Sequence, residues 1–369
     1  MTVLFLLAAA FSLYTVIGYP VLLAFLAKRA QPVDKAYLPR SVSVILPVRN
    51  GERWIGRKLE SLLALDYPLK LMEILVISDG STDATESIAE SYASRGIRLL
   101  HIPASGKALA LNRGLEEARG EILFFTDVRQ ELNPKSLRNL VACFHDPAVG
   151  VTSGELVIRK GQTAAESNVG LYWRYEKWIR IHQSRLDSVI GATGCIYAMR
   201  RELARPLPPE TLDDDVYLPL AAFFKGRRVI LDESATAFDD PANLPAEFRR
   251  KVRTLAGVYQ VIGYYPALLG PGNRLWLHFL SHKVARLLLP WALLILAATS
   301  FALPDPWRTL ACSTQAAFYG LAILDWAVPE TSPLKRVTSP LCTFLVLMAA
   351  SLCAVAILFV PARKLWKVR

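Results

Sequence analysis

The chain has 369 residues, a formal net charge of +11 and a hydrophobic content of 53%. Its apolar residues gather toward both ends, which favours one soluble domain between membrane segments over two ordinary soluble domains. The positive charge comes without a basic stripe interleaved with aromatic residues, so we expect no nucleic-acid partner and attribute the charge to anionic lipid and phosphate groups. The five cysteines lack metal-like or disulfide-like spacing and are expected to be reduced and structural.

Apolar runs near both ends predict membrane-spanning helices. Residues 3–26 carry no formal charge and are long enough to cross a hydrocarbon core of roughly 30 Å. A secretory signal peptide is the alternative, but Met1-Thr2 provides no basic n-region and no clear small-residue cleavage site follows. Residues 287–303 and 339–360 are apolar enough to be the other expected spans.

A further apolar run, residues 309–328, is weaker because Gln315 and Asp325 each add a cost of insertion. The number of spans, three or four, therefore stays open. The side of the membrane on which the C-terminal tail lies depends on that number. By the positive-inside rule, basic residues closely after the first run place the soluble domain in the cytoplasm: Lys28, Arg29, Lys35 and Arg40. We expect a multi-pass protein of the cytoplasmic membrane, with residues 1–28 as the anchor, 29–245 as the cytoplasmic domain, 246–286 as amphipathic interface helices and 287–369 as a C-terminal membrane region of two or three spans.

Between the membrane segments, short β-branched runs alternate with stretches of helical spacing. The predicted strands are 41–46, 73–77, 97–101, 121–125, 149–155 and 227–231. The predicted helices are 55–65, 84–94, 107–118, 164–186, 245–265 and 274–289. Such alternation predicts an α/β domain with a mostly parallel sheet, whose ligands bind beyond the carboxyl ends of the strands.

Polar side chains follow several of these predicted strands. Asn50 and Glu52 come after the first, and Asp79 ends the second, where its carboxylate could accept hydrogen bonds from a base or a ribose. A plain strand-to-helix turn capped by Thr82 or Asp83 is the competing interpretation. Each motif alone is weak.

Two more charged groups lie where the predicted sheet would bind a ligand. Lys107 opens a predicted helix, where its ammonium could meet phosphate oxygens or simply lie in solvent. Asp127 emerges from a very apolar strand, and a carboxylate there requires a cation or a hydrogen-bond donor.

Charge crowding marks two later segments. Asp213, Asp214 and Asp215 are consecutive, and their mutual repulsion is expensive unless a metal, a base role or a basic neighbour uses them. The cluster Arg249, Arg250, Lys251 and Arg253 opens the helix that approaches the membrane, where it could neutralise a diphosphate or contact lipid headgroups.

Together these pieces resemble the family 2 inverting glycosyltransferases, over residues 41–282. The matching stretches are SVILPVRNGE, LVISDGSTDAT, GKALALNRGL, FFTDVRQ, GATGCIYAMRR, TLDDDVYLP and EFRRKVRTLAG. The resemblance implies a GT-A type nucleotide-sugar-binding domain and an enzyme that transfers a sugar from a nucleotide-diphosphate donor, expected to be a UDP-sugar.

The resemblance also implies roles for individual residues. Asp79 and Glu52, with Asn50 beside them, would contact the donor's base and ribose, and Lys107 would lie near the donor. Asp127 corresponds to the first acid of the DxD motif and would bind Mg²⁺ or Mn²⁺. In the family's ED pair, Asp214 precedes Asp215, which would be the catalytic base that deprotonates the acceptor hydroxyl.

Two departures from the family pattern affect these expectations. The second acid of DxD is Arg129, so the metal is less secure and Arg129 could supply part of the cation's charge at the donor. The QxxRW motif of processive synthases keeps only its arginine, Arg253, which with Arg250 would contact the diphosphate. Gly194 and Cys195 would border the acceptor site.

The membrane helices favour transfer to a growing polysaccharide, as in poly-N-acetylglucosamine, cellulose or hyaluronan synthases. The missing tryptophan of QxxRW weakens processive elongation and keeps a membrane-lipid acceptor open. A non-catalytic nucleotide-binding scaffold is the third interpretation. Possible partners are thus the nucleotide-sugar donor, a polysaccharide or lipid acceptor, membrane lipids and further synthase subunits.

Overall fold

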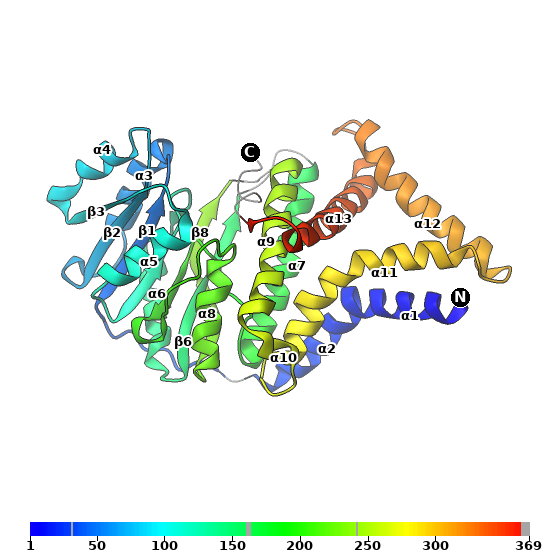
Figure 1. Cartoon of the computed structure of the whole chain (residues 1–369), viewed down its shortest axis with the longest axis horizontal. Coiled ribbons are helices and arrows are strands. Elements are labelled where there is room, and N and C mark those ends of the chain that lie inside the picture. Colours follow the sequence, from blue (N-terminus) through cyan, green and yellow to red (C-terminus); the bar gives the residue numbers. More distant parts are fainter. Residues whose placement is uncertain (31, 160–163, 241–242, 363–369) are drawn as a thin grey trace. The chain divides into compact units, whose positions relative to one another are not determined.

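The computed structural model describes residues 1–30, 32–159, 164–240 and 243–362, and it divides into two compact units. Unit one comprises residues 1–28, 160–182 and 240–369, and unit two comprises residues 29–159 and 183–239. Figure 1 shows unit two as the part that contains the sheet and unit one as the helical part. Each unit is described here by itself.

Unit two is built on a sheet whose eight strands, among the described residues, run in the order β3-β2-β1-β4-β7-β6-β8-β5. Pairing is parallel from β3 through β2 and β1 to β4 and again between β6 and β8, whereas β7 runs antiparallel to both of its neighbours. The bounds are β1 Val42–Val48, β2 Met72–Asp79, β3 Ile97–Ile102, β4 Ile122–Phe125, β5 Glu131–Leu132, β6 Val149–Ile158, β7 Tyr197–Arg200 and β8 Arg228–Asp239. The predicted strands are confirmed, and the short strands β5 and β7 were not predicted.

The helices of unit two connect these strands as α/β crossovers. Their bounds are α3 Glu52–Leu63, α4 Thr85–Glu90, α5 Lys107–Glu117, α6 Ser136–Ala142 and α8 Asp214–Phe224, with the short turns η3 Leu69–Leu71, η4 Ala93–Arg95, η5 Cys143–His145 and η6 Arg201–Leu203. The predicted helix over 84–94 is thus interrupted between α4 and η4. On α3 the buried side chains recur at helical spacing, because Ile55, Leu59 and Leu62 face the core. Figure 1 shows β3, β2 and β1 side by side at one end of the sheet, in the order of their pairing.

Unit one is helical. Its elements are α1 Thr2–Leu13, η1 Tyr14–Gly18, α2 Tyr19–Leu26, η2 Ala27–Arg29, most of α7 Ala164–Leu186, α9 Leu244–Tyr264, η7 Pro266–Leu269, α10 Trp276–His278, η8 Phe279–Val284, α11 Ala285–Ser300, α12 Trp307–Leu324, η9 Asp325–Ala327, α13 Lys335–Ala354 and η10 Val355–Leu358. The N-cap residue Asn243 accepts a hydrogen bond from the N–H of Ala246 and so fixes the start of α9.

Three helices among the described residues are long and apolar enough to cross a membrane: Thr2–Arg29, Trp276–Ser300 and Lys335–Leu358. They correspond to the expected spans 3–26, 287–303 and 339–360, and α12, which covers the weaker run, is not among them. The predicted interface helix over 274–289 and the predicted span over 287–303 form one continuous helix that begins at Trp276.

This continuous helix carries polar side chains that pair within unit one. Arg286 and His282 both contact the buried carboxylate of Glu176 on α7, with His282 Nε2 at 3.2 Å. The hydroxyl of Tyr19 is hydrogen-bonded to Nδ1 of His278 at 3.1 Å, and its ring stacks on His282. Polar groups in apolar helices are expensive unless they are paired, so these contacts let the helix keep its charges. Burial raises the pKa of Glu176, but Arg286 and His282 more than offset this and hold it well below its usual range.

Candidate functional site

The loops after β1 and β2 are braced by reciprocal hydrogen bonds. Asn50, in the left-handed region at φ 50°, accepts from the N–H of Thr82 at 2.9 Å. The N–H of Glu52 donates to Asp83, and the carboxylate of Glu52 in turn accepts from the N–H of Ala84, each at 3.1 Å. Asn50 and Glu52 therefore lie at the carboxyl edge of the sheet, as predicted, and they satisfy the backbone at the start of the next helix.

Asp79, at the end of β2, is buried and organises the turn before α5. One of its carboxylate oxygens accepts from the N–H of Ser105 at 2.6 Å, and both accept from the N–H of Gly106 at 3.0 Å. Gly106 has φ 98°, a conformation in which a side chain would be strained. Asp79 thus positions the residue that follows, Lys107, a structural role that the sequence did not indicate, and its contact with a base or ribose stays a prediction.

Lys107 joins two of the predicted site carboxylates. Its Nζ lies 3.1 Å from Oδ1 of Asp127, after β4, and 3.1 Å from Oδ1 of Asp214, in the first turn of α8. Burial lowers the pKa of Lys107, but the charges of Asp127, Asp214 and Asp215 more than offset it and raise the pKa above its ordinary value. The ammonium therefore stays protonated at neutral pH and is a fixed positive charge at the carboxyl edge of the sheet.

Asp215 follows Asp214 in the first turn of α8, and its carboxylate lies against Gly194. A Cβ placed on Gly194 would be 2.8 Å from Oδ2 of Asp215. The backbone of the two segments is also joined, because the N–H of Ala192 donates to the carbonyl of Asp215 at 2.7 Å. The predicted base and the predicted acceptor-side glycine are thus brought together, and the absence of a side chain at Gly194 lets the carboxylate of Asp215 lie there.

Cys195, the second residue predicted on the acceptor side, is buried. Burial raises the pKa of its thiol, so the side chain is a neutral packing group at ordinary pH. Its backbone carbonyl accepts a hydrogen bond of 2.8 Å from the hydroxyl of Thr126, which precedes Asp127. The segment that carries Gly194 is therefore tied to the turn that carries Asp127.

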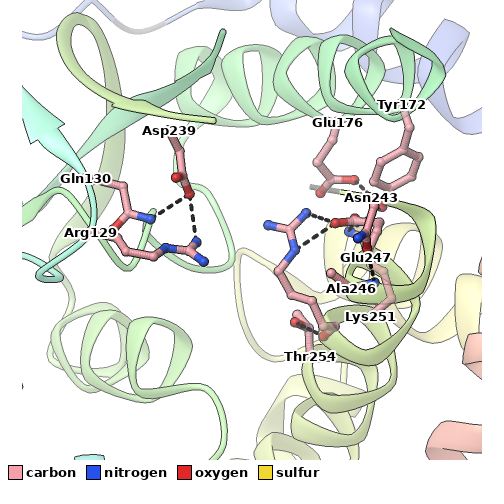
Figure 2. A network of polar contacts seen from close by, with 11 residues as sticks. Arg129, Gln130, Tyr172, Glu176, Asp239, Asn243, Ala246, Glu247, Lys251 and Thr254 are labelled. Atoms are coloured by element: carbon pink, nitrogen blue, oxygen red, sulfur yellow. Dashed lines mark hydrogen bonds and ion pairs between the residues drawn. The ribbon is translucent and has the colours of Figure 1, made fainter. Parts of the chain in front are cut away.

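Arg129, which stands in place of the second acid of DxD, is engaged by Asp239 at the end of β8. Its guanidinium donates to Oδ2 of Asp239 at 2.8 Å, and the side-chain amide of Gln130 donates to the same oxygen at 2.7 Å (Figure 2). This ion pair ties the turn after β4 to the end of β8.

Lys58 is a site-supporting residue that the sequence analysis missed. It lies on the buried face of α3 with only 1% of its surface exposed, and its Nζ donates to the hydroxyl of Thr126 at 2.6 Å and to the carbonyl of Gln130 at 2.7 Å. Burial lowers its pKa to about 8, partly offset by Cys195, Asp127 and Glu131. The signal was present in the sequence, because Lys58 falls on the same helical face as Ile55, Leu59 and Leu62.

The two predicted diphosphate contacts Arg250 and Arg253 lie on α9 and belong to unit one. Arg250 donates to Glu247 from Nε at 2.8 Å and lies over the ring of Trp173 at 4.7 Å. Lys251 donates to the hydroxyl of Tyr172 at 3.1 Å (Figure 2). The roles of Arg250 and Arg253 toward a donor stay predictions.

A divalent cation would find a partial set of ligands in this site. Within the residues that the structure describes, no group of three or more His, Cys, Asp or Glu side chains is arranged to hold a metal ion. Asp127 is the partly exposed carboxylate, 38% by side chain, at the carboxyl edge of the sheet. A hard cation prefers carboxylate, phosphate and water oxygens, so Asp127 suits a metal whose other ligands come from a diphosphate and water.

Comparison with known proteins connects this geometry to one family. Residues 43–207 match the model of glycosyl transferase family 2. The glycosyltransferase YibD of Escherichia coli is 36% identical over 102 residues, which are 27% of this chain and 29% of that protein. The poly(ribitol-phosphate) β-N-acetylglucosaminyltransferase TarS of Staphylococcus aureus is 33% identical over 103 residues, 27% of this chain and 18% of that protein. The chain thus spans less than a third of the length of these curated relatives.

The fold comparison extends to both units. The structure of the mannosyltransferase PcManGT from Pyrobaculum calidifontis in complex with GDP-Man and Mn²⁺ matches with a TM-score of 0.72 and 24% identity, and the match covers 95% of this chain and 99% of that one. The predicted GT-A type fold with apolar helices at both ends is therefore confirmed. Residues 43–207 are thus similar to a glycosyl transferase family 2 domain.

Proposed function

We propose that this chain, through its glycosyl transferase family 2 domain, transfers a sugar from a nucleotide-diphosphate donor to an acceptor at the cytoplasmic face of a membrane. The observation that carries the proposal is the ammonium of Lys107, which lies 3.1 Å from both Asp127 and Asp214 at the carboxyl edge of the sheet. That edge is where α/β sheets bind ligands. A fixed cation there would stabilise the negative charge that develops on a departing diphosphate.

Asp215 is the catalytic base in this proposal. It takes the proton of the acceptor hydroxyl while the hydroxyl oxygen bonds to the anomeric carbon, and the bond from that carbon to the diphosphate oxygen breaks. Attack opposite the leaving group inverts the configuration, and the nucleotide diphosphate leaves with the bonding pair. The first turn of α8 suits this role, because the partial positive charge of a helix N-terminus favours the ionised carboxylate.

Asp127 would hold Mg²⁺ or Mn²⁺, which supplies positive charge to the diphosphate when bound. The side chains of this chain do the rest: Asp79 orders the turn that presents Lys107, and Asn50 and Glu52 hold the two loops on which the nucleoside would rest. A UDP-sugar is the donor that the sequence resemblance favours. GDP-mannose is included in the tests because the similar PcManGT structure contains it.

The acceptor divides the proposal into two forms. A growing polysaccharide follows from the resemblance to membrane polysaccharide synthases. A membrane lipid is favoured by the missing tryptophan after Arg253 and by the small number of candidate spans, three among the described residues, since one transfer to a lipid requires no translocation channel. Incubation with radiolabelled donor and membranes distinguishes them: a lipid product partitions into organic solvent, whereas a polysaccharide remains as high-mass material on a gel.

The decisive experiment measures nucleotide release by detergent-purified full-length protein with a panel of UDP- and GDP-sugars, in Mg²⁺, Mn²⁺ or chelator, alongside Asp215→Asn. Asp66→Asn is the matched control, since Asp66 is an exposed acid that pairs with Arg138 at the surface. We expect metal-dependent release from one class of donor, lost by at least about 100-fold in Asp215→Asn and kept in the control. Release that survives in Asp215→Asn removes the base assignment, and no release with any donor and acceptor membranes favours the scaffold interpretation.

A further inference from the structure

Unit two contains a buried ammonium, that of Lys58, which has no part in the chemistry proposed above. Lys58 sits on the core-facing side of α3, between Ile55 and Leu59 in the helical pattern. A charged amine in such a place is costly unless its donors are satisfied. Its contacts therefore deserve a functional explanation as well as a structural one.

The two acceptors of Lys58 bracket the turn that carries Asp127. Nζ donates to the hydroxyl of Thr126 at 2.6 Å on one side of the turn and to the carbonyl of Gln130 at 2.7 Å on the other. The turn contains both Asp127 and Arg129. The ammonium of Lys58 thus connects the two ends of the turn that carries Asp127, the acid that pairs with Lys107.

The hydroxyl of Thr126 extends this contact to the acceptor side. It accepts from Lys58 and donates to the carbonyl of Cys195 at 2.8 Å. Cys195 follows Gly194, and Gly194 lies against the carboxylate of Asp215. A continuous hydrogen-bonded chain therefore runs from α3 through the Asp127 turn to the segment beside the proposed base.

We propose that Lys58 is a positioning residue for sugar transfer, which holds the Asp127 turn and the Gly194 segment in register through Thr126, so that donor and acceptor groups meet at the reacting distance. The proposal rests on the function proposed above. Lys58 touches neither substrate and acts only through Thr126, Gln130 and Cys195. Geometry of this kind matters because a misplacement of about 1 Å can cost on the order of 100-fold in rate.

Two variants test the chain at different links. Lys58→Met keeps the length and packing of the side chain and removes both hydrogen bonds. Thr126→Val keeps the shape of the side chain, leaves the contact from Lys58 to Gln130 and removes the link to Cys195. Lys70→Met is the control, since Lys70 is an exposed lysine of unit two in η3.

The experiment measures kcat and both KM values of full-length protein in detergent, with the thermal midpoint of each variant. We expect Lys58→Met to lower kcat by at least about 10-fold and to raise the donor KM and the Mn²⁺ concentration for half-activation. We expect Thr126→Val to lower kcat and raise the acceptor KM, with the donor KM within about twofold of the wild type.

A role in stability alone predicts a different pattern. It would lower the thermal midpoint while the folded protein kept its kcat and KM values, and that pattern in both variants overturns the proposal. If Lys58→Met fails to fold, Thr126→Val alone tests the proposal. A wild-type kcat and acceptor KM in Thr126→Val would show that the hydrogen bonds of Thr126 do not position the Gly194 segment for transfer. If the wild-type protein itself shows no activity, the proposed function is refuted. That outcome differs from a wild-type protein that is active and variants that keep its kcat and KM values, which would refute only the role of Lys58.

Discussion

The guanidinium of Arg129 donates a 2.8 Å hydrogen bond to Asp239, so the residue that replaces the second acid of DxD is already paired at the end of β8. An exposed ion pair of this kind contributes roughly 0.2–1 kcal/mol. The pairing holds the guanidinium of Arg129 at the end of the Asp127 turn.

We therefore predict that Arg129→Ala lowers kcat/KM by no more than about fivefold, which corresponds to about 1 kcal/mol. The dependence on Mg²⁺ or Mn²⁺ stays unchanged. Nucleotide release with and without chelator measures both quantities. Wild-type turnover that persists in chelator and disappears in Arg129→Ala would instead show that the arginine replaces the metal.

Gly194→Ala tests the space beside the proposed base. The new Cβ would lie 2.8 Å from Oδ2 of Asp215, and because this oxygen ends a flexible side chain, the carboxylate should move while the fold stays intact. We expect kcat to fall by at least about 10-fold with a nearly unchanged thermal midpoint.

Gly56→Ala is the matched control for Gly194→Ala. Its Cβ would meet Ile88 at 3.8 Å and Tyr92 at 4.0 Å, both ordinary contacts, and alanine suits a helix interior better than glycine. We expect full activity and a slightly raised midpoint. Equal activity of both glycine variants would exclude Asp215 as a group that must reach the acceptor.

Lys107→Met tests the fixed cation. The pKa of Lys107 is raised in the folded protein, because neighbouring carboxylates outweigh burial, so the residue stays charged throughout an ordinary pH range and does not cause an alkaline loss of activity. We expect the substitution to lower kcat about 100-fold. The acid limb of the pH–rate profile should move to higher pH, because the carboxylate cluster loses a charge that favours its ionised form. An unshifted acid limb would show that the charge of Lys107 does not affect the reacting carboxylates. Lys107→Arg keeps the charge and should return the acid limb to its wild-type position.

Lys58 gives a pH dependence of stability with a defined sign. Burial lowers its pKa from 10.5 to about 8, so between these values the unfolded chain binds a proton that the folded protein has released. Unfolding free energy therefore rises with pH in this window, by at most about 3 kcal/mol for the complete shift. Thermal midpoints of wild type and Lys58→Met at pH 7.5 and 9.5 check this sign: the wild-type midpoint should rise relative to that of the variant at the higher pH, and a constant difference would contradict the shift.

The three candidate spans predict a topology that labelling can check. With the soluble domain in the cytoplasm, the segment between Ser300 and Lys335 lies outside and the C-terminal tail returns to the cytoplasm. A membrane-impermeant maleimide should therefore label Thr331→Cys in intact cells and Ser94→Cys only after permeabilisation. The reverse labelling pattern would show that the topology is inverted. If Thr331→Cys is not labelled in intact cells, α12 also crosses the membrane.

The positions of β1, β2 and β4 were predictable because these parallel strands are largely buried on both faces and therefore appear as continuous apolar runs. β7 was missed because its four residues, Tyr197–Arg200, are too few to show a period and end in a charged residue. β5 has only two residues, Glu131–Leu132, and is defined by its pairing with β8. Such strands depend on long-range contacts that a local pattern does not contain.

The site was predictable as a set of residue types, whereas the contacts among them were not. The acids at 127 and 213–215 were identified from the sequence, but the pairing of Lys107 with both Asp127 and Asp214 was not, because the three residues come from different parts of the chain. The function of Asp79 in ordering Ser105 and Gly106 depends on two loops that meet only in the folded sheet. Arg129 could not be paired with Asp239 from the sequence, since 109 residues lie between them.

The mutual bonds of Asn50 and Glu52 with the segment 82–84 have a consequence for engineering donor preference. Each loop completes the hydrogen bonding of the other, so neither keeps its shape when it is replaced alone. A graft from a relative with another nucleotide preference should carry both segments together as one cassette. Directed evolution should likewise find that substitutions in one loop succeed mainly beside compensating changes in the other.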